Sequence, residues 1–251
     1  MQYVRFLSGN SIQWGVVEGG YIRTVCGNLY ERPKAGEIVC AVSEARILAP
    51  VDPYHNKIVG IAANYGVKDQ RDGPGIFMKQ PGTVVGTGDS IIYPRTCISV
   101  IHEAEVAIVI GRSARKIKAV HALDYVMGYT CANDVSAKDL HVSDTGRGTS
   151  MRVKHFDTFF PVGPFISTGL DGDNLNIQCR VNGKTEVNSS SSEMIWPIAD
   201  LISWVSEVME LHPGDVISSG CPDTNEIQVG DTVEVEIEGI GTLTNPVVRD
   251  L

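Results

Sequence analysis

The stretch from residue 102 to residue 110, His-Glu-Ala-Glu-Val-Ala-Ile-Val-Ile, constrains the fold more than any other part of the chain. It predicts a strand whose later residues are apolar on both faces, so the strand is buried. Glu103 and Glu105 lie at its start and point to one face, with their carboxylates about 7 Å apart. Like charges entering a buried strand are unfavourable unless a cation lies between them or this end of the strand reaches solvent. Both interpretations stay open at this point.

Elsewhere, strand patterns outnumber helix patterns. Residues Thr232 to Glu238 alternate apolar and acidic side chains, which predicts a half-buried strand. The clearest helix begins near Pro197, has apolar residues at helical spacing and ends at His212-Pro213-Gly214. A second short helix is expected over residues Ala119 to Met127. Together these patterns predict a sheet-rich α+β fold.

Two prolines divide the chain. The first fifty residues contain short strand patterns separated by glycine turns. The segment Ala49-Pro50-Val51-Asp52-Pro53 follows, and its prolines remove two backbone donors, as is typical of a linker. We therefore expect a small β-rich N-terminal domain over residues 1–52 and a main domain over residues 53–251.

Composition excludes several classes of protein. The 251 residues carry a formal net charge of −9, which argues against dedicated nucleic-acid binding. No run approaches the roughly 18 apolar residues of a membrane-spanning helix, and the N-terminus lacks the apolar core of a signal peptide. The six cysteines form no Cys-x-x-Cys pair, which favours reduced, buried thiols. We expect a cytoplasmic protein that binds neither nucleic acid nor membrane.

A third carboxylate follows another apolar stretch. Asp134 stands about thirty residues after the acidic pair and could bring its carboxylate to the same point. An Asn-Asp pair is also typical of a turn or a helix cap, so this alternative stays open. Three carboxylates without cysteine or paired histidine would form a hard oxygen site suited to Mg²⁺, Mn²⁺ or Ca²⁺.

These features, taken together, resemble the fumarylacetoacetate hydrolase superfamily. The resemblance runs in order from about Lys57 to Val248 with spacings that fit without large gaps. The motifs that carry it are Phe77-Met78-Lys79-Gln80-Pro81, Glu103-Ala-Glu105, Asn133-Asp134-Val-Ser-Ala, Lys154 with Phe156-Asp157-Thr158-Phe159, Pro213-Gly214-Asp215-Val216-Ile217 and the ending Val235 to Pro246.

The resemblance implies a fold, an assembly and a metal. Layered mixed β-sheets with few helices and a homodimer are expected. Glu103, Glu105 and Asp134 match three carboxylate ligands of Mg²⁺, with Mn²⁺ and Ca²⁺ as alternatives. Lys154 matches a lysine near the bound substrate, where an ammonium would stabilise developing negative charge. Alternatively, Lys154 pairs with Asp157 or another structural acid.

Further residues follow from the same resemblance. Lys79, Thr158 and Tyr65 are expected to bind the substrate. Many hydrolytic members carry a His and a Glu that activate water shortly after the Asn-Tyr pair. This chain has Lys68 and Arg71 at those places, and a protonated lysine cannot act as a base unless burial strongly lowers its pKa.

Two more departures concern the substrate site. Lys138 and His141 replace an Arg and a Gln, so Lys138 is a candidate clamp for the substrate carboxylate. His141 is a candidate general acid or base, because histidine titrates near neutral pH, or else a substrate contact or a surface residue. A Gly-Thr-Pro near the end of the site is Gly220-Cys221-Pro222 here.

The expected activity follows the family. Its members act on 2-oxo acids and 1,3-dicarbonyl compounds, which implies a small-molecule substrate of that class. The leading expectation is hydrolysis of a C–C bond in a 2,4-dioxo acid, such as an acylpyruvate, through a metal-stabilised enolate. A 2-oxo-acid decarboxylase or a keto–enol isomerase is the alternative, which the missing His and Glu favour. A catalytically inactive binding homologue is a third.

Overall fold

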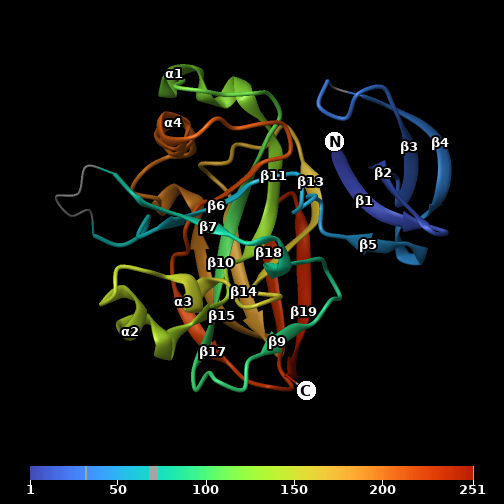
Figure 1. The fold of residues 1–251 in the computed structure, drawn as a ribbon. Helices are drawn as coiled ribbons and strands as arrows, with labels where there is room; N and C mark the ends of the chain where they lie inside the picture. The colour runs from blue at the N-terminus through green and yellow to red at the C-terminus, as the bar shows by residue number, and fades with distance from the viewer. Residues whose placement is uncertain (32, 68–72, 251) are drawn as a thin grey trace.

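The strand β10 (Val100–Ile110) runs through the centre of the molecule (Figure 1). The structure is a computed structural model that describes residues 1–31, 33–67 and 73–250. Every residue of β10 except Glu103 is buried. Val106, Ile108 and Ile110 face one hydrophobic core, whereas Ala107 and Val109 face another. Two cores on opposite sides explain why this strand is apolar at consecutive positions, as the sequence predicts.

The larger sheet contains β10 and mixes parallel with antiparallel pairs. Its main path is β4 (Lys34–Ala41), β3 (Tyr21–Cys26), β2 (Ser11–Glu18), β1 (Gln2–Ser8), β13 (Phe160–Ser167), β11 (Val126–Asn133), β10, β16 (Val216–Ser218), β6 (Ile58–Ala62) and β7 (Gly75–Lys79). Four strands pair outside this path: β12 (Ser136–Ala137) and β17 (Thr224–Ile227) with β10, β5 (Arg46–Leu48) with β1, and β8 (Val84–Val85) with β13.

A second, five-stranded sheet packs against one face of the first. Its buried residues, such as Val235 and Leu243, share a core with Val106 and Ile108 of β10. The predicted half-buried strand is confirmed as β18, whose valines and isoleucine are buried. The strands, in sheet order, are β15 (Lys184–Ser190), β14 (Asn176–Val181), β18 (Thr232–Ile237), β19 (Gly241–Arg249) and β9 (Ile91–Tyr93).

Helices are few, which completes the sheet-rich α+β fold predicted from the sequence. The longest is α4, which buries Ile198, Leu201, Ile202 and Val205 at the predicted helical spacing. In the described part of the chain the α-helices are α1 (Ala119–Ala122), α2 (His141–Thr145), α3 (Met151–Lys154) and α4 (Ile198–Val208).

The helix predicted over residues 119–127 is wrong at its C-terminal end. Only α1 and a 3₁₀ turn at Leu123–Tyr125 are helical, and Val126 and Met127 belong to β11. Val126 pairs with Ile110 of β10, and the Gly111 N–H donates to the Tyr125 carbonyl at 2.7 Å. Pairing with a central strand therefore ends the helix before its local pattern does.

The N-terminal strands β1 to β4 curl to one side of the main body (Figure 1). They continue the larger sheet, because Gln2 and Tyr3 of β1 pair with Ser167 and Ile166 of β13. The division into residues 1–52 and 53–251 stays a prediction.

The prediction for the cysteines is correct only in part. All six are free thiols, and Cys97, Cys131 and Cys179 are buried. Cys26 is exposed, because its position in β3 faces away from the core.

In the described part of the chain, no helix has both the length and the apolar character needed to cross a membrane.

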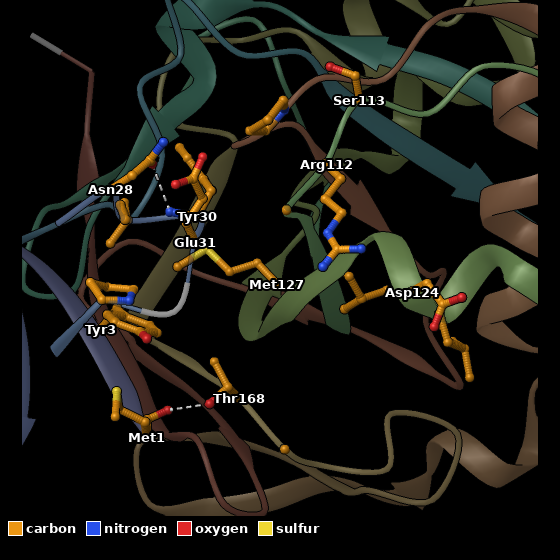
Figure 2. Close-up of a pocket in the computed structure, with 17 residues that line it drawn as sticks. Met1, Tyr3, Asn28, Tyr30, Glu31, Arg112, Ser113, Asp124, Met127 and Thr168 are labelled. Atoms are coloured by element: carbon orange, nitrogen blue, oxygen red, sulfur yellow. Dashed lines mark hydrogen bonds between the residues drawn. The ribbon is translucent and has the colours of Figure 1, made fainter.

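A cavity of about 1130 Å³ separates the N-terminal strands from the far end of β10 (Figure 2). Tyr3 and Tyr30 line one side of it, and Arg112 and Asp124 line the other. Arg112 is nine residues beyond Glu103, which corresponds to about 30 Å of extended chain. This cavity is therefore remote from the acidic pair.

Candidate functional site

The strand β10 changes partners at Glu103 and Ala104. Its first residues pair with β12 and β17, whereas β11 pairs with it from Ala104 onward and β16 from Ala107 onward. Both neighbours change at nearly the same level. Residues 134–135, between β11 and β12, and residues 219–223, between β16 and β17, therefore meet beside the acidic pair. The register of the sheet creates the site.

Glu103 and Glu105 lie on the same face of β10, and solvent does not surround them. Glu105 is 1% exposed, so the interpretation that this end of the strand reaches solvent is wrong for its carboxylate. Its Oε2 accepts hydrogen bonds from the Ser218 hydroxyl and from the Gly220 N–H, the latter at 3.0 Å. Its Oε1 is buried and has no hydrogen-bond partner among the described residues.

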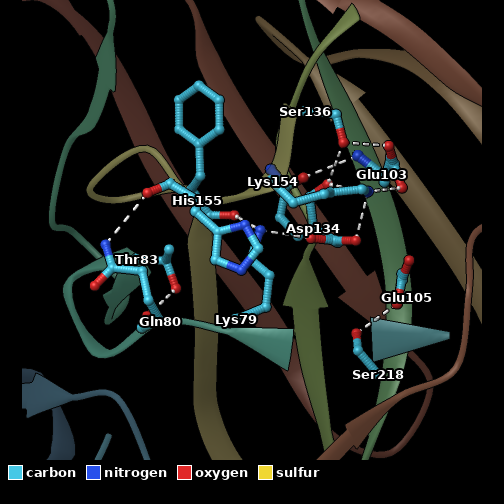
Figure 3. A network of polar contacts seen from close by, with 12 residues as sticks. Lys79, Gln80, Thr83, Glu103, Glu105, Asp134, Ser136, Lys154, His155 and Ser218 are labelled. Atoms are coloured by element: carbon cyan, nitrogen blue, oxygen red, sulfur yellow. Dashed lines mark hydrogen bonds and ion pairs between the residues drawn. The ribbon is translucent and has the colours of Figure 1, made fainter. Parts of the chain in front are cut away.

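Asp134 joins the acidic pair, with two lysines beside it (Figure 3). Its Oδ1 accepts a hydrogen bond from Lys79 Nζ at 2.7 Å, and its Oδ2 accepts one from Lys154 Nζ at 2.6 Å. Lys154 Nζ also donates to Glu103 Oε2 at 2.8 Å. The carboxylate of Asp134 therefore does not cap a helix, and Lys154 pairs with two acids of the site. Asp157 instead accepts from Gln80 at 3.0 Å.

The charges in this cluster shift one another's pKa values. Burial alone would raise the pKa of Asp134, but Lys154 and Lys79 outweigh it and lower that pKa. Burial would lower the pKa of Lys154, but Asp134 and Glu103 outweigh it and raise that pKa. For Lys79, burial prevails over Asp134 and lowers the pKa. Burial, with Asp134 and Glu103 next, raises the pKa of Glu105 well above its ordinary range.

Several groups to which the sequence assigned no role surround the acids. The Ser136 hydroxyl donates to Glu103 Oε1 at 2.5 Å, and Ser218 donates to Glu105. The Cys221 thiol donates to Glu103 Oε2 at 3.7 Å, and burial followed by the two glutamates raises its pKa well above normal. Alternation along β12 could have indicated Ser136, which lies two residues after Asp134. Ser218 and Cys221 come from a distant segment that no local pattern connects to β10, and only the family resemblance placed Cys221 near the site.

The predicted substrate-binding residues occupy different surroundings. Lys79 is fully buried behind Asp134 and also donates to the Phe159 carbonyl at 2.9 Å. The Tyr65 hydroxyl is buried with no hydrogen-bond partner among the described residues. Burial raises the pKa of Tyr65, and Glu105 adds to the shift. Thr158 has a positive φ of 67°, and its hydroxyl accepts from the Ile92 N–H at 2.8 Å, so this side chain holds a turn.

Lys138, the candidate clamp, and His141, the candidate acid or base, lie at the rim of the site, outside the buried acidic cluster. Lys138 and His141 are exposed, in the 3₁₀ turn Lys138–Leu140 and at the start of α2. Both elements contact α3, which carries Lys154. Lys68 and Arg71 lie outside the described residues.

The residues present fit a divalent cation. Among the described residues, three carboxylates face two ammonium groups, so one acid of the cluster has no cation there. The orphaned Oε1 of buried Glu105 identifies that acid. A buried carboxylate oxygen without a partner is costly, and a cation held by the acids would satisfy it. Glu103, Glu105 and Cys221 also place one donor atom each within 4.8 Å of one another.

Two known family models together match almost the whole chain. Residues 55–248 match the family model described as fumarylacetoacetate (FAA) hydrolase, C-terminal. Residues 1–50 match a second model, described as Rv2993c-like, N-terminal.

Individual relatives are similar over most of their length. Protein Rv2993c from Mycobacterium tuberculosis is 41% identical over 83% of this chain and 80% of its own. The mitochondrial oxaloacetate tautomerase FAHD2B from Homo sapiens is 38% identical over 82% of this chain and 70% of its own. The crystal structure of 5-carboxymethyl-2-hydroxymuconate delta-isomerase from Mycobacterium smegmatis covers 100% of both chains, with 36% identity and a TM-score of 0.92.

Proposed function

Because this chain belongs to the fumarylacetoacetate hydrolase family, we propose that it is a divalent-metal-dependent enzyme that enolises a small 2-oxo acid. The proposed net reaction is interconversion of keto and enol forms. The observation that carries the proposal is the cluster of three carboxylates and two ammonium groups around a buried, unpartnered carboxylate oxygen. Such a cluster is suited to stabilising negative charge that develops on the oxygens of a substrate.

The proposed metal ligands are Glu103, Glu105 and Asp134. Their oxygens suit Mg²⁺, with Mn²⁺ and Ca²⁺ as alternatives. When bound, such a cation supplies Lewis-acid stabilisation to the carbonyl and carboxylate oxygens of a 2-oxo acid.

The chain's own residues have distinct proposed roles. Lys154, 13% exposed and adjacent to two of the ligands, supplies a positive charge to the substrate oxygen that gains negative charge. Lys79 is a positioning residue. Its ammonium donates to Asp134 Oδ1 and to the Phe159 carbonyl, and these hydrogen bonds fix the direction of the Asp134 carboxylate. The Tyr65 hydroxyl, buried and without a hydrogen-bond partner among the described residues, orients the substrate.

Two considerations favour isomerisation over hydrolysis. Hydrolysis needs a group that activates water, whereas enolisation does not need water as a nucleophile. The candidate base His141 is exposed at the rim, on α2. Two of the relatives reported above are named as a tautomerase and an isomerase, which supports the same reaction class here.

Hydrolysis of a 2,4-dioxo acid such as an acylpyruvate is the second candidate. The packing of α2 against α3 favours it, since this contact puts His141 on the element next to Lys154. In that case Lys138 would clamp the substrate carboxylate, and His141 would activate water. His141→Ala would then lower hydrolysis by about 100-fold or more without weakening metal binding.

A single set of assays separates these reactions. Metal-free protein is supplied with Mg²⁺ and either oxaloacetate or an acylpyruvate, and products are followed by ultraviolet absorbance and NMR, with Glu105→Gln as the control. Faster keto–enol exchange without cleavage, lost in the variant, supports the proposal. A free carboxylic acid from the acylpyruvate supports hydrolysis, and carbon dioxide from oxaloacetate supports a decarboxylase. Metal binding without any turnover supports an inactive binding homologue.

A further inference from the structure

A thiol lies beside the acidic cluster at the point where β16 leads to β17. Cys221 Sγ is 3.7 Å from Glu103 Oε2. Glu103, Glu105 and Cys221 each place one ligand atom within 4.8 Å of the others, which is the spacing of atoms around a common ion. Two carboxylates and a thiol form a different donor set from the three carboxylates proposed above, because a thiolate is a soft ligand.

A second observation indicates that this donor set is incomplete. Glu105 is 1% exposed, and its Oε1 has no partner among the described residues. Figure 3 shows that one oxygen of Glu105 bonds to Ser218 while the other turns toward Glu103. The unsatisfied oxygen is therefore directed toward Glu103, the residue that Cys221 contacts.

We propose that Cys221 makes this site a binding site for thiophilic divalent cations, with Zn²⁺ or Cd²⁺ held by Glu103, Glu105 and Cys221. The inference deepens the proposed function, since it shares two of the proposed Mg²⁺ ligands. On binding, the S–H bond breaks, a metal–sulfur bond forms and the proton passes to solvent. Zn²⁺ binds sulfur as well as oxygen ligands and has a low coordination number, about four, whereas Mg²⁺ prefers oxygen ligands alone.

The lysines make the two donor sets distinguishable. Lys154 donates to both Glu103 and Asp134, and Lys79 donates to Asp134. A cation held by Glu103, Glu105 and Cys221 leaves Asp134 paired with both ammonium groups, so of the lysine hydrogen bonds named here only that from Lys154 to Glu103 is disturbed. Thiophilic cations therefore bind with less rearrangement of the lysines, and they compete with Mg²⁺ for the two glutamates.

The test is a titration of the metal-free, 251-residue protein with Cd²⁺. Ultraviolet absorbance reports sulfur-to-cadmium charge transfer, and calorimetry reports affinity. Cys221→Thr removes the soft donor, and Cys26→Ser is the matched control, because Cys26 is an exposed thiol in β3. The same proteins are titrated with Mn²⁺, followed by electron paramagnetic resonance, as the oxygen-seeking probe.

We expect the charge-transfer band in the wild type and in Cys26→Ser, and its loss in Cys221→Thr. Cd²⁺ affinity should fall at least tenfold in Cys221→Thr, while Mn²⁺ affinity changes by less than threefold. Cd²⁺ binding without the band, unchanged in Cys221→Thr, overturns the inference and leaves the carboxylate site intact. Failure of both cations to bind overturns the inference together with the proposed metal dependence.

Discussion

The ammonium of Lys154 lies 2.8 Å from Oε2 of Glu103, although 51 residues separate the two in the chain. The same ammonium is 2.6 Å from Oδ2 of Asp134, so one positive charge connects two of the three acids. Neither ion pair lies in bulk water, because the exposed fractions of these side chains are 13% for Lys154, 14% for Glu103 and 1% for Asp134. Their mutual attraction is therefore weakly screened.

Replacing Lys154 by methionine keeps the length of the side chain and removes its charge. We expect the turnover of a 2-oxo acid to fall by about 100- to 1,000-fold, because one donor to the developing negative charge is lost. Mn²⁺ affinity should not weaken, since Glu103 and Asp134 lose a competing cation. Lys184→Met, at an exposed lysine paired with Glu186, is the control. Unchanged turnover would remove Lys154 from the mechanism.

Divalent-metal affinity should rise with pH. Burial, then Asp134 and Glu103, raise the pKa of Glu105, so the folded protein holds a proton there above the ordinary glutamate pKa of about 4.3. A cation must displace this proton, and affinity should increase about tenfold per pH unit for one displaced proton, up to the raised pKa. Mn²⁺ titrations at several pH values measure the slope. In Glu105→Gln we expect weak binding without this slope.

The link between α2 and α3 should contribute measurably to stability. Arg152 donates to buried Asp144 through its guanidinium and, at 3.0 Å, through its backbone N–H. Arg152→Ala removes the guanidinium hydrogen bonds from this carboxylate, so we expect a lower unfolding temperature. Half of the Arg152 side chain is exposed, so solvent screens this ion pair and we expect a small decrease in the unfolding temperature. Thermal unfolding, with exposed Arg115→Ala as the control, measures the difference.

The pH dependence of this difference has a definite sign. Hydrogen bonds from Arg152 lower the pKa of Asp144. The stabilisation is therefore complete above the ordinary aspartate pKa of about 3.9, and it is lost as the pH falls through the lowered value. Equal unfolding temperatures for the wild type and Arg152→Ala at neutral pH would contradict this role.

Three of the thiols should be unreactive in the folded protein. Burial raises the pKa of Cys97 to about 11 and that of Cys131 and Cys179 to about 12 each. Because the thiolate is the reactive form, none of these three should be labelled by a thiol reagent at pH 8 until the protein is denatured. Exposed Cys26 should react in the folded state. Mass spectrometry identifies the labelled residues; rapid native labelling of Cys131 would contradict the prediction.

The sequence by itself determined the features that depend on local pattern. Consecutive apolar residues after Glu105 identify a central strand, and the spacing of Ile198, Leu201, Ile202 and Val205 identifies α4. These predictions succeed because side-chain direction follows the period of the element. The sequence motifs also indicate the family without any reference to tertiary structure.

Only the tertiary structure decided what each acid contacts. The change of strand partners at Ala104 directs Cys221 toward Glu103, and it lets two lysines share Asp134. The tertiary structure also ends the second helix before Val126, because Val126 pairs with Ile110 in the sheet. The physical reason is that these contacts join segments tens to more than a hundred residues apart. Their geometry depends on the register of several strands at once, which no local periodicity encodes.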